Sequence, residues 1–139
     1  MAVTHLDPER LHASPFFSQG VVAETGRTLY VGGQNGTDSE GMIEGELAEQ
    51  ATQALRNVLT VLEAAGVGPE QVAKLTVYLH AEADPQVGFA AAQQVWGPHP
   101  TAITVLRVVG FARPEALVEI EAIAALPWRA APHSPGAVS

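Results

Sequence analysis

The sequence predicts an α+β domain in which strands and helices follow one another in the order β-β-α-β-α-β-β. Two segments repeat apolar residues every three or four positions, as helices do, whereas the other regular segments alternate or are rich in β-branched residues. The chain has 139 residues, of which 47% are hydrophobic, so it suits one packed domain. We assign that domain to residues 1–127 and expect a flexible tail over residues 128–139, which are rich in Ala, Pro, Ser and Gly.

The first predicted unit is a β-hairpin. Residues 1–17 hold two prolines, which limit them to short regular pieces. Residues 18–23 and 28–31 have the composition of strands, and the turn residues 24–27 between them include a glycine. We therefore expect these two strands to pair with each other.

The clearest helix is predicted over residues 47–65. Its apolar side chains recur in steps of three and four, and polar side chains, Gln50 and Asn57 among them, take the other side. Gly66 is a suitable residue to end this helix. The preceding residues 35–46 are mostly turn formers and acids, so we expect a solvated loop there.

A strand over residues 72–79 and a second helix over residues 85–96 follow. The strand alternates and is rich in β-branched residues, and Lys74 is expected to point outward from it. Asp84 can cap the helix, and Pro85 fits its first position. Helices of this length bury one stripe each, so both helices are expected on one face of a mixed sheet.

The last two strands are predicted over residues 102–109 and 117–126, joined as a hairpin by residues 110–116. The final strand is apolar on both of its faces, which favours burial on both faces. Two helices cannot cover both faces of the sheet. We therefore expect the chain to associate with copies of itself through sheet faces or edges.

Composition excludes several classes of function. Fifteen Asp and Glu against seven Lys and Arg give a net charge of −8, so nucleic acid and anionic membranes are not expected partners. There is no cysteine, which removes thiol chemistry and Cys-ligated zinc. The five histidines have no metal-ligand spacing, so we expect no metal site and no cofactor. The chain shows no signal-peptide pattern and no apolar run of membrane length, so we expect a cytoplasmic protein.

Glu119 and Glu121 are the first candidates for chemistry. They stand two residues apart in an apolar strand and therefore share one face. Ionised carboxylates beside apolar neighbours are costly unless they are paired or solvated. Either this face is partly exposed or paired with an arginine, or a carboxylate here binds a water molecule or accepts a proton.

Several blocks of the sequence resemble the Rid family, also called the YjgF family, in order and spacing. The matching segments lie within residues 15–125 and read PFFSQGVV, TLYVGGQ, AEQATQALRNVLTVLEAAG, VAKLTVYL, HPTA and LVEIEAIA. The resemblance implies a chorismate-mutase-like fold and a homotrimer whose sheets pack inward as a barrel, with ligand clefts between neighbouring subunits. For the deaminase members of the family, it also implies hydrolysis of a small 2-imino acid to a 2-keto acid and ammonia.

In that resemblance, a glutamate and a backbone carbonyl position the attacking water. The glutamate falls on Glu119, and the carbonyl falls on Val105. The glycine after the first hairpin falls on Gly33, and Gly32 replaces the family's small hydroxyl residue before it. The resemblance therefore retains Glu119 as the implied catalytic residue.

The implied ligand cleft is more apolar in this chain than in the family. The family's tyrosine falls on Phe17, its asparagine falls near Phe89, and its carboxylate-binding arginine falls on Ile103. Loss of a bidentate arginine contact costs about 2–5 kcal/mol. Arg107 and Arg113 are the candidate substitutes for the lost cation.

These residues leave three hypotheses for function. The first is a hydrolytic imine or enamine deaminase with an altered substrate, which would lack a carboxylate. The second is a non-catalytic trimer that binds a small, largely apolar ligand. The third is an enzyme of a specialised pathway that acts on an enamine or a cyclic intermediate. A ribonuclease activity is attached to some Rid proteins, but the net charge of −8 and the lack of a basic stripe argue against it here.

Overall fold

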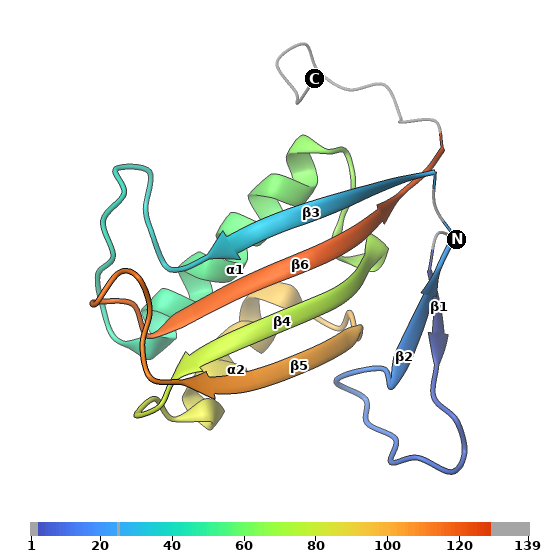
Figure 1. The fold of residues 1–139 in the computed structure, drawn as a ribbon, viewed down its shortest axis with the longest axis horizontal. Helices are drawn as coiled ribbons and strands as arrows, with labels where there is room; N and C mark the ends of the chain where they lie inside the picture. The colour runs from blue at the N-terminus through green and yellow to red at the C-terminus, as the bar shows by residue number, and fades with distance from the viewer. Residues whose placement is uncertain (1–2, 25, 129–139) are drawn as a thin grey trace.

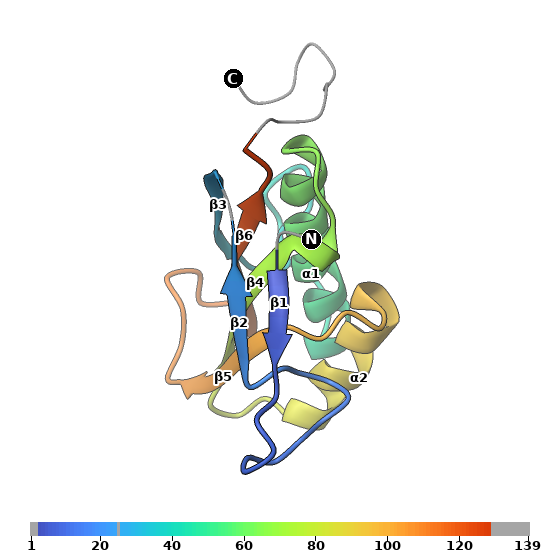
Figure 2. The same cartoon turned by 90° about the vertical axis from the view of Figure 1, so that its right-hand side faces the viewer.

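A computed structural model describes residues 3–24 and 26–128, and its main body is a four-stranded mixed sheet with two helices on one face (Figures 1 and 2). Strands β4 and β5 are parallel, and the other neighbours are antiparallel. The predicted α+β class is confirmed. In spatial order, the strands are β3 (Arg27–Gln34), β6 (Val118–Leu126), β4 (Val72–His80) and β5 (Ala102–Val108).

Both helices begin and end close to the predicted residues. Helix α1 spans Leu47–Ala64, and α2 spans Pro85–Trp96. Gly66 follows α1 with φ of +78°, a conformation that glycine adopts without the strain of a side chain. The Asp84 carboxylate accepts a hydrogen bond from the backbone N–H of Gln86 at 3.0 Å, which satisfies one free donor of the first turn of α2. A short 3₁₀ turn over Pro69–Gln71 leads from α1 into β4.

The hydrophobic core lies between the helices and the sheet. Ala54, Val58 and Leu62 of α1 are fully buried and belong to one cluster with alternate residues of β6. In β6, the even-numbered residues from 118 to 124 are buried, whereas residues 119, 121 and 123 are more exposed. The sheet therefore has a helix-covered face and an open face, and the open face is turned toward the viewer in Figure 1.

The predicted pairing of residues 18–23 with residues 28–31 is wrong. Strand β2 (Gly20–Ala23) pairs with an unpredicted strand, β1 (Val3–Leu6), in a separate antiparallel ribbon. The ribbon lies beside the β5 side of the sheet, where the Ser18 N–H donates to the Thr101 carbonyl at 2.9 Å (Figure 1). Strand composition predicted a strand over residues 18–23, of which the structure forms Gly20–Ala23, but it could not show that residues 3–6 would supply its partner.

The predicted hairpin between the last two strands is also wrong. β4 lies between β5 and β6, and its C-terminal end bonds to both sides. The His80 N–H donates to the Leu117 carbonyl at 2.9 Å, and the Ala81 N–H donates to the Val108 carbonyl at 2.7 Å. The connection after β5 is long enough to cross the end of β4, so β6 pairs on the far side of that strand.

Gln50 is buried, although its position in the sequence placed it on the polar side of α1. It is 3% exposed, and its side-chain amide donates to the carbonyls of Gly45 and Glu115. Its side-chain oxygen accepts from the Leu117 N–H at 2.8 Å. One side chain thus ties α1 to the loop that precedes it and to the loop before β6.

The loop before α1 is largely exposed, as predicted, and its first residues are also held to the helix. Asn57 donates to the carbonyls of Asn35 and Thr37.

The predicted tail over residues 128–139 lies outside the described residues from position 129 onward. Within residues 3–24 and 26–128, no helix is both long and apolar enough to cross a membrane.

Candidate functional site

The structure separates the predicted site residues into two groups on opposite faces of the sheet. Glu119 follows the alternation of β6 onto the open face. Ile103 and Val105 of β5 line a cavity on the helix-covered face, together with Phe17 and Phe89. Within one chain, Glu119 and these four apolar residues therefore do not share a cavity.

Gly33 lies directly under the side chain of Glu119. A Cβ atom built at Gly33 would overlap a carboxylate oxygen of Glu119 and would come within 2.9 Å of its Cδ atom. The absence of a side chain at residue 33 therefore makes room for the carboxylate. Glu119 has no hydrogen bond or ion pair with any other residue in the described part of the chain. Its carboxylate is available to an external partner, such as water.

Tyr78 of β4 lies opposite Glu119 and contacts the second acid of the strand. Its hydroxyl donates to Glu121 Oε2 at 3.3 Å. Burial on the sheet face raises the pKa of the Tyr78 phenol, and the negative charges of Glu121 and Glu119 and the hydrogen bond to Glu121 raise it further. Tyr78 therefore remains a neutral donor on this face at physiological pH.

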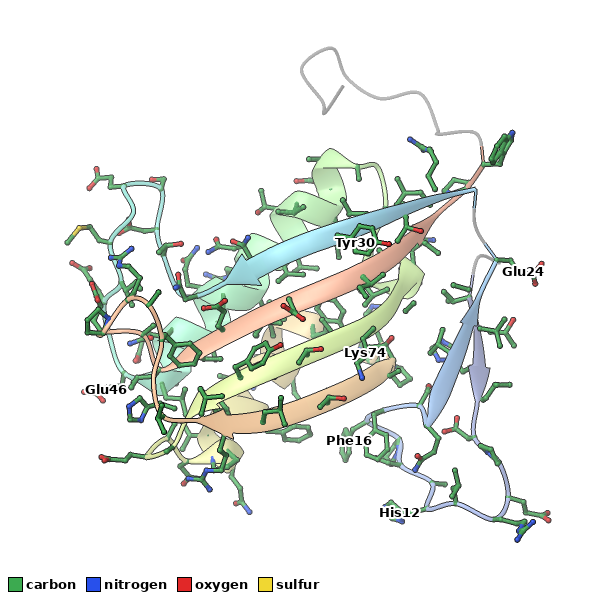
Figure 3. The ribbon with its side chains drawn as sticks, in the orientation of Figure 1. His12, Phe16, Glu24, Tyr30, Glu46 and Lys74 are labelled. Atoms are coloured by element: carbon green, nitrogen blue, oxygen red, sulfur yellow. The ribbon has the colours of Figure 1, made fainter. Side chains whose placement is uncertain are left out.

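Lys74 adds a cation to the open face. Its ammonium group donates to Thr104 Oγ1 at 2.6 Å, and it faces Ile123 across the strand pair. Figure 3 shows Lys74 and Tyr30 on the open side of the sheet. Lys74 and Tyr30 line a small cavity of about 280 Å³ together with Gly32 and Glu121.

The sequence prediction that Lys74 points outward is confirmed. Sequence reasoning did not identify Tyr78 and Lys74 as neighbours of the Glu119 and Glu121 carboxylates. The two-residue period places Lys74 and Tyr78 on one face of their own strand, but only the pairing of β4 with β6 shows that this face is the one that carries Glu119 and Glu121.

The apolar cavity lies under α2, on the opposite side of the sheet from Glu119. It has a volume of about 450 Å³ and holds Phe17, Phe89, Ile103 and Val105, four of the predicted cleft residues. Phe16, from the loop between β1 and β2, packs edge-on against Phe89 with ring centroids 5.1 Å apart. Phe16 lies between the β1–β2 ribbon and the start of β5 (Figure 3).

Neither candidate substitute for the missing arginine lines this cavity. Arg107 donates to the backbone carbonyls of Ala81 and Ala83, at 2.6 and 3.2 Å, and so braces the turn between β4 and α2. Arg113 forms an ion pair with Glu115 at 3.0 Å and donates to the Gly41 carbonyl. Both guanidinium groups therefore have structural partners within the chain.

The sequence matches a family model over most of its length. The model is described as Endoribonuclease L-PSP, and it matches residues 8–126. A RutC family protein of Pyrococcus horikoshii is 33% identical over 117 residues, which is 78% of this chain and 85% of that protein. The human 2-iminobutanoate/2-iminopropanoate deaminase is 43% identical over 65 residues, which is 45% of this chain and 46% of that protein. The match thus spans less than half the length of the human relative.

Solved structures show the same fold. A Rid-family protein of unknown function from Yersinia pestis, YyfB, superposes with a TM-score of 0.81 at 33% identity, covering 91% of this chain and all of that chain. The YjgF gene product of E. coli superposes with a TM-score of 0.66 at 26% identity, covering 88% of this chain and 98% of that chain. The fold and the sequence blocks therefore point to the same group of proteins.

Proposed function

This chain belongs to the endoribonuclease L-PSP family, which includes its Rid-family neighbours, and we propose that it hydrolyses an imine or enamine in a cleft between subunits of a homotrimer. Similarity to 2-iminobutanoate/2-iminopropanoate deaminases supports the class of reaction. The observation that carries the proposal is the carboxylate of Glu119, which lies over Gly33 on the open face without a partner in the described chain.

The proposed reaction adds one water across the C=N bond. Glu119 accepts a proton from that water, and the Val105 carbonyl is the second proposed acceptor that orients it. The water oxygen bonds to the imine carbon, and the nitrogen takes up protons and leaves as ammonia. The product is the corresponding carbonyl compound, so no oxidant or reductant is needed. A held water loses less entropy on reaching the transition state than a free one.

Two subunits are needed to assemble this site, because one chain holds its two halves on opposite faces of the sheet. The proposed cleft brings Gly33 and Glu119 of one subunit against the β5 edge of its neighbour. Exposed apolar side chains on both surfaces support such contacts. Tyr30 on the open face is 73% exposed, and Val105 and Leu106 on β5 are 55% and 45% exposed.

The proposed substrate lacks a carboxylate. Ile103 stands where the resemblance expects a carboxylate-binding arginine, and it lines an apolar cavity. Arg107 and Arg113 are bonded elsewhere. A carboxylate placed against this wall would lose its hydration without gaining a cation. The net charge of −8 argues against RNA cleavage, because an acidic chain repels a phosphate backbone.

Imine hydrolysis measured on two substrates tests this function. One is freshly generated 2-iminopropionate, and the other is a neutral imine released by an amine oxidase from phenethylamine. The remaining imine is trapped as its semicarbazone. We expect wild type to hydrolyse the neutral imine faster than it hydrolyses 2-iminopropionate, which carries a carboxylate. Glu119→Gln should abolish the activity, and Glu121→Gln, on the same face of the same strand, should retain most of it.

Ile103→Arg supplies the complementary test. If the cleft is assembled as proposed, this variant should gain activity on 2-iminopropionate. If wild type and this variant leave both imines untouched, the hydrolytic function is wrong. The second candidate, a non-catalytic trimer that binds a small ligand, would then stand, and the apolar cavity under α2 is the observation that favours it.

A further inference from the structure

The cavity under α2 has the size and lining of a site for an apolar small molecule. Its volume of about 450 Å³ lies within the range of roughly 300–1,000 Å³ that is usual for ligand pockets. An apolar cavity of about 150 Å³ is enough to hold a benzene molecule in another protein. The space under α2 therefore accommodates an aromatic ring with a short chain attached.

Aromatic side chains define the shape of this cavity. Trp96, at the end of α2, is buried, and its indole N–H donates to the His99 carbonyl at 2.9 Å. That bond satisfies the only polar atom of the Trp96 side chain and holds the ring in place. The cavity is therefore lined by the apolar part of the indole ring. At the exposed side of the cavity, Phe16 and Phe89 meet edge to face. A flat apolar group can pack against rings held in this way.

The cavity wall carries a single polar side chain. Gln93 of α2 lines the cavity, and every other lining residue is apolar or glycine. The Gln93 side-chain amide makes no hydrogen bond to another residue in the described ranges. No acid, arginine, lysine or histidine lines the cavity. A charged ligand would lose its hydration here without a counter-charge, whereas one neutral carbonyl or hydroxyl could bond to Gln93.

We propose that this cavity binds the apolar body of the substrate, an aromatic ring or a branched aliphatic chain, with one neutral polar group hydrogen-bonded to Gln93. The inference rests on the proposed function only in calling the ligand a substrate. It adds to that function the class of molecule, a neutral aryl or branched-alkyl compound larger than 2-iminopropionate. The binding itself can be measured without turnover.

Fluorescence of Trp96 provides the binding test. The chain has two tryptophans, and Trp128 is outside this cavity, so Trp128→Phe leaves Trp96 as the sole reporter. Two probes share one ring and differ in charge: phenylacetone is neutral, and phenylacetate is an anion. We expect phenylacetone to change Trp96 fluorescence saturably. Phenylacetate should bind at least about tenfold more weakly, because the cavity has no cation for it.

Substitutions on α2 locate the site. Ala92 lines the cavity, so Ala92→Phe should fill it and abolish phenylacetone binding. Gln93→Leu should weaken binding about fivefold through loss of one neutral hydrogen bond. Gln94 is exposed and does not line the cavity, so Gln94→Leu is the matched control and should bind as wild type does. Phe89→Ala, at the exposed side, gives a second binding-deficient variant should Ala92→Phe fail to fold. Circular dichroism checks each fold.

Equal affinity for the two probes, or full binding by folded Ala92→Phe and Phe89→Ala, would overturn the inference. Two further outcomes separate a failure of this inference from a failure of the proposed hydrolytic function. Saturable, cavity-dependent binding of phenylacetone by a protein that hydrolyses neither imine rejects the hydrolase and retains the cavity site. Hydrolysis of the neutral imine that is unaffected by Ala92→Phe rejects the cavity site and retains the hydrolase.

Discussion

The carboxylate of Glu119 occupies the space that a Cβ atom on Gly33 would take. The two residues lie on neighbouring strands, β6 and β3, where the pairing is irregular between Val31 and Gln34. The irregularity brings a residue without a side chain against the acid. The glycine at residue 33 therefore sets where the Glu119 carboxylate lies. By contrast, a Cβ atom built on the adjacent Gly32 would have no atom beyond its chain neighbours within 4 Å.

The pair Gly33→Ala and Gly32→Ala tests this relationship. We expect Gly33→Ala to displace the Glu119 side chain and to reduce hydrolysis of the neutral imine by about 10- to 100-fold, since small displacements of a reacting group are costly. Gly32→Ala should keep activity close to that of wild type. Steady-state kinetics on both variants measure the effect, and equal activity of the two would show that the contact does not position Glu119.

Tyr78 gives a prediction for alkaline pH. Its raised pKa means that the folded chain keeps the phenol proton at a pH where the unfolded chain has lost it. The stability it contributes is complete below the ordinary tyrosine pKa, near 10, and is lost as pH rises through the raised pKa. We expect the free energy of unfolding to fall in this window for wild type and to fall less for Tyr78→Phe. Urea titrations between pH 9 and pH 11 measure it.

The tyrosinate absorbance isolates the same group. The chain has two tyrosines, so Tyr78→Phe leaves only Tyr30. We expect the part of the wild-type titration that belongs to Tyr78 to move to lower pH in Glu121→Gln, because that variant removes the nearest negative charge and weakens the hydrogen bond. An unchanged Tyr78 titration in Glu121→Gln would show that the two side chains are not coupled.

Gln50 should be costly to replace. Gln50→Leu keeps the size of the side chain but removes the partners of the Leu117 N–H and of the Gly45 and Glu115 carbonyls. Gln50 itself is buried, so loss of its three hydrogen bonds costs about 2–4 kcal/mol in total. Urea unfolding measures the loss. The exposed Gln94→Leu is the control and should change stability by less than about 0.5 kcal/mol.

Arg107 is expected to act in stability and not in substrate binding. Its guanidinium braces the carbonyls of Ala81 and Ala83 before α2. Arg107→Met should lower the free energy of unfolding by about 1 kcal/mol. The KM for 2-iminopropionate should stay unchanged. A KM that rises severalfold for this anionic substrate, with the neutral imine unaffected, would instead identify Arg107 as the substitute cation.

Local patterns in the sequence predicted the elements well. The apolar period of three and four residues identified α1 to within one residue, and Asp84, Pro85 and Gly66 marked helix ends that the structure retains. Glu119 and Glu121 share a face because side chains alternate along a strand. These features depend on neighbours within a few positions, which a single sequence displays directly.

The candidate site was only partly predictable. Phe17, Phe89, Ile103 and Val105 do meet in one cavity, but that cavity lies across the sheet from Glu119. Ile103 and Glu119 lie on different strands, so alternation within each strand cannot show whether they share a face. That depends on which residues pair across the sheet, and β4 stands between their two strands.

By itself, the sequence determined the helices, most of the strands, the helix ends and the acids that share a strand face, because each follows from the period or chemistry of a short segment. The tertiary structure alone decided that β6 lies between β3 and β4, that β1 pairs with β2, and that Gln50 is buried. It also decided that the apolar cavity and Glu119 lie on opposite faces of the sheet. These features depend on contacts between residues far apart in the chain, and many pairings satisfy the same local pattern.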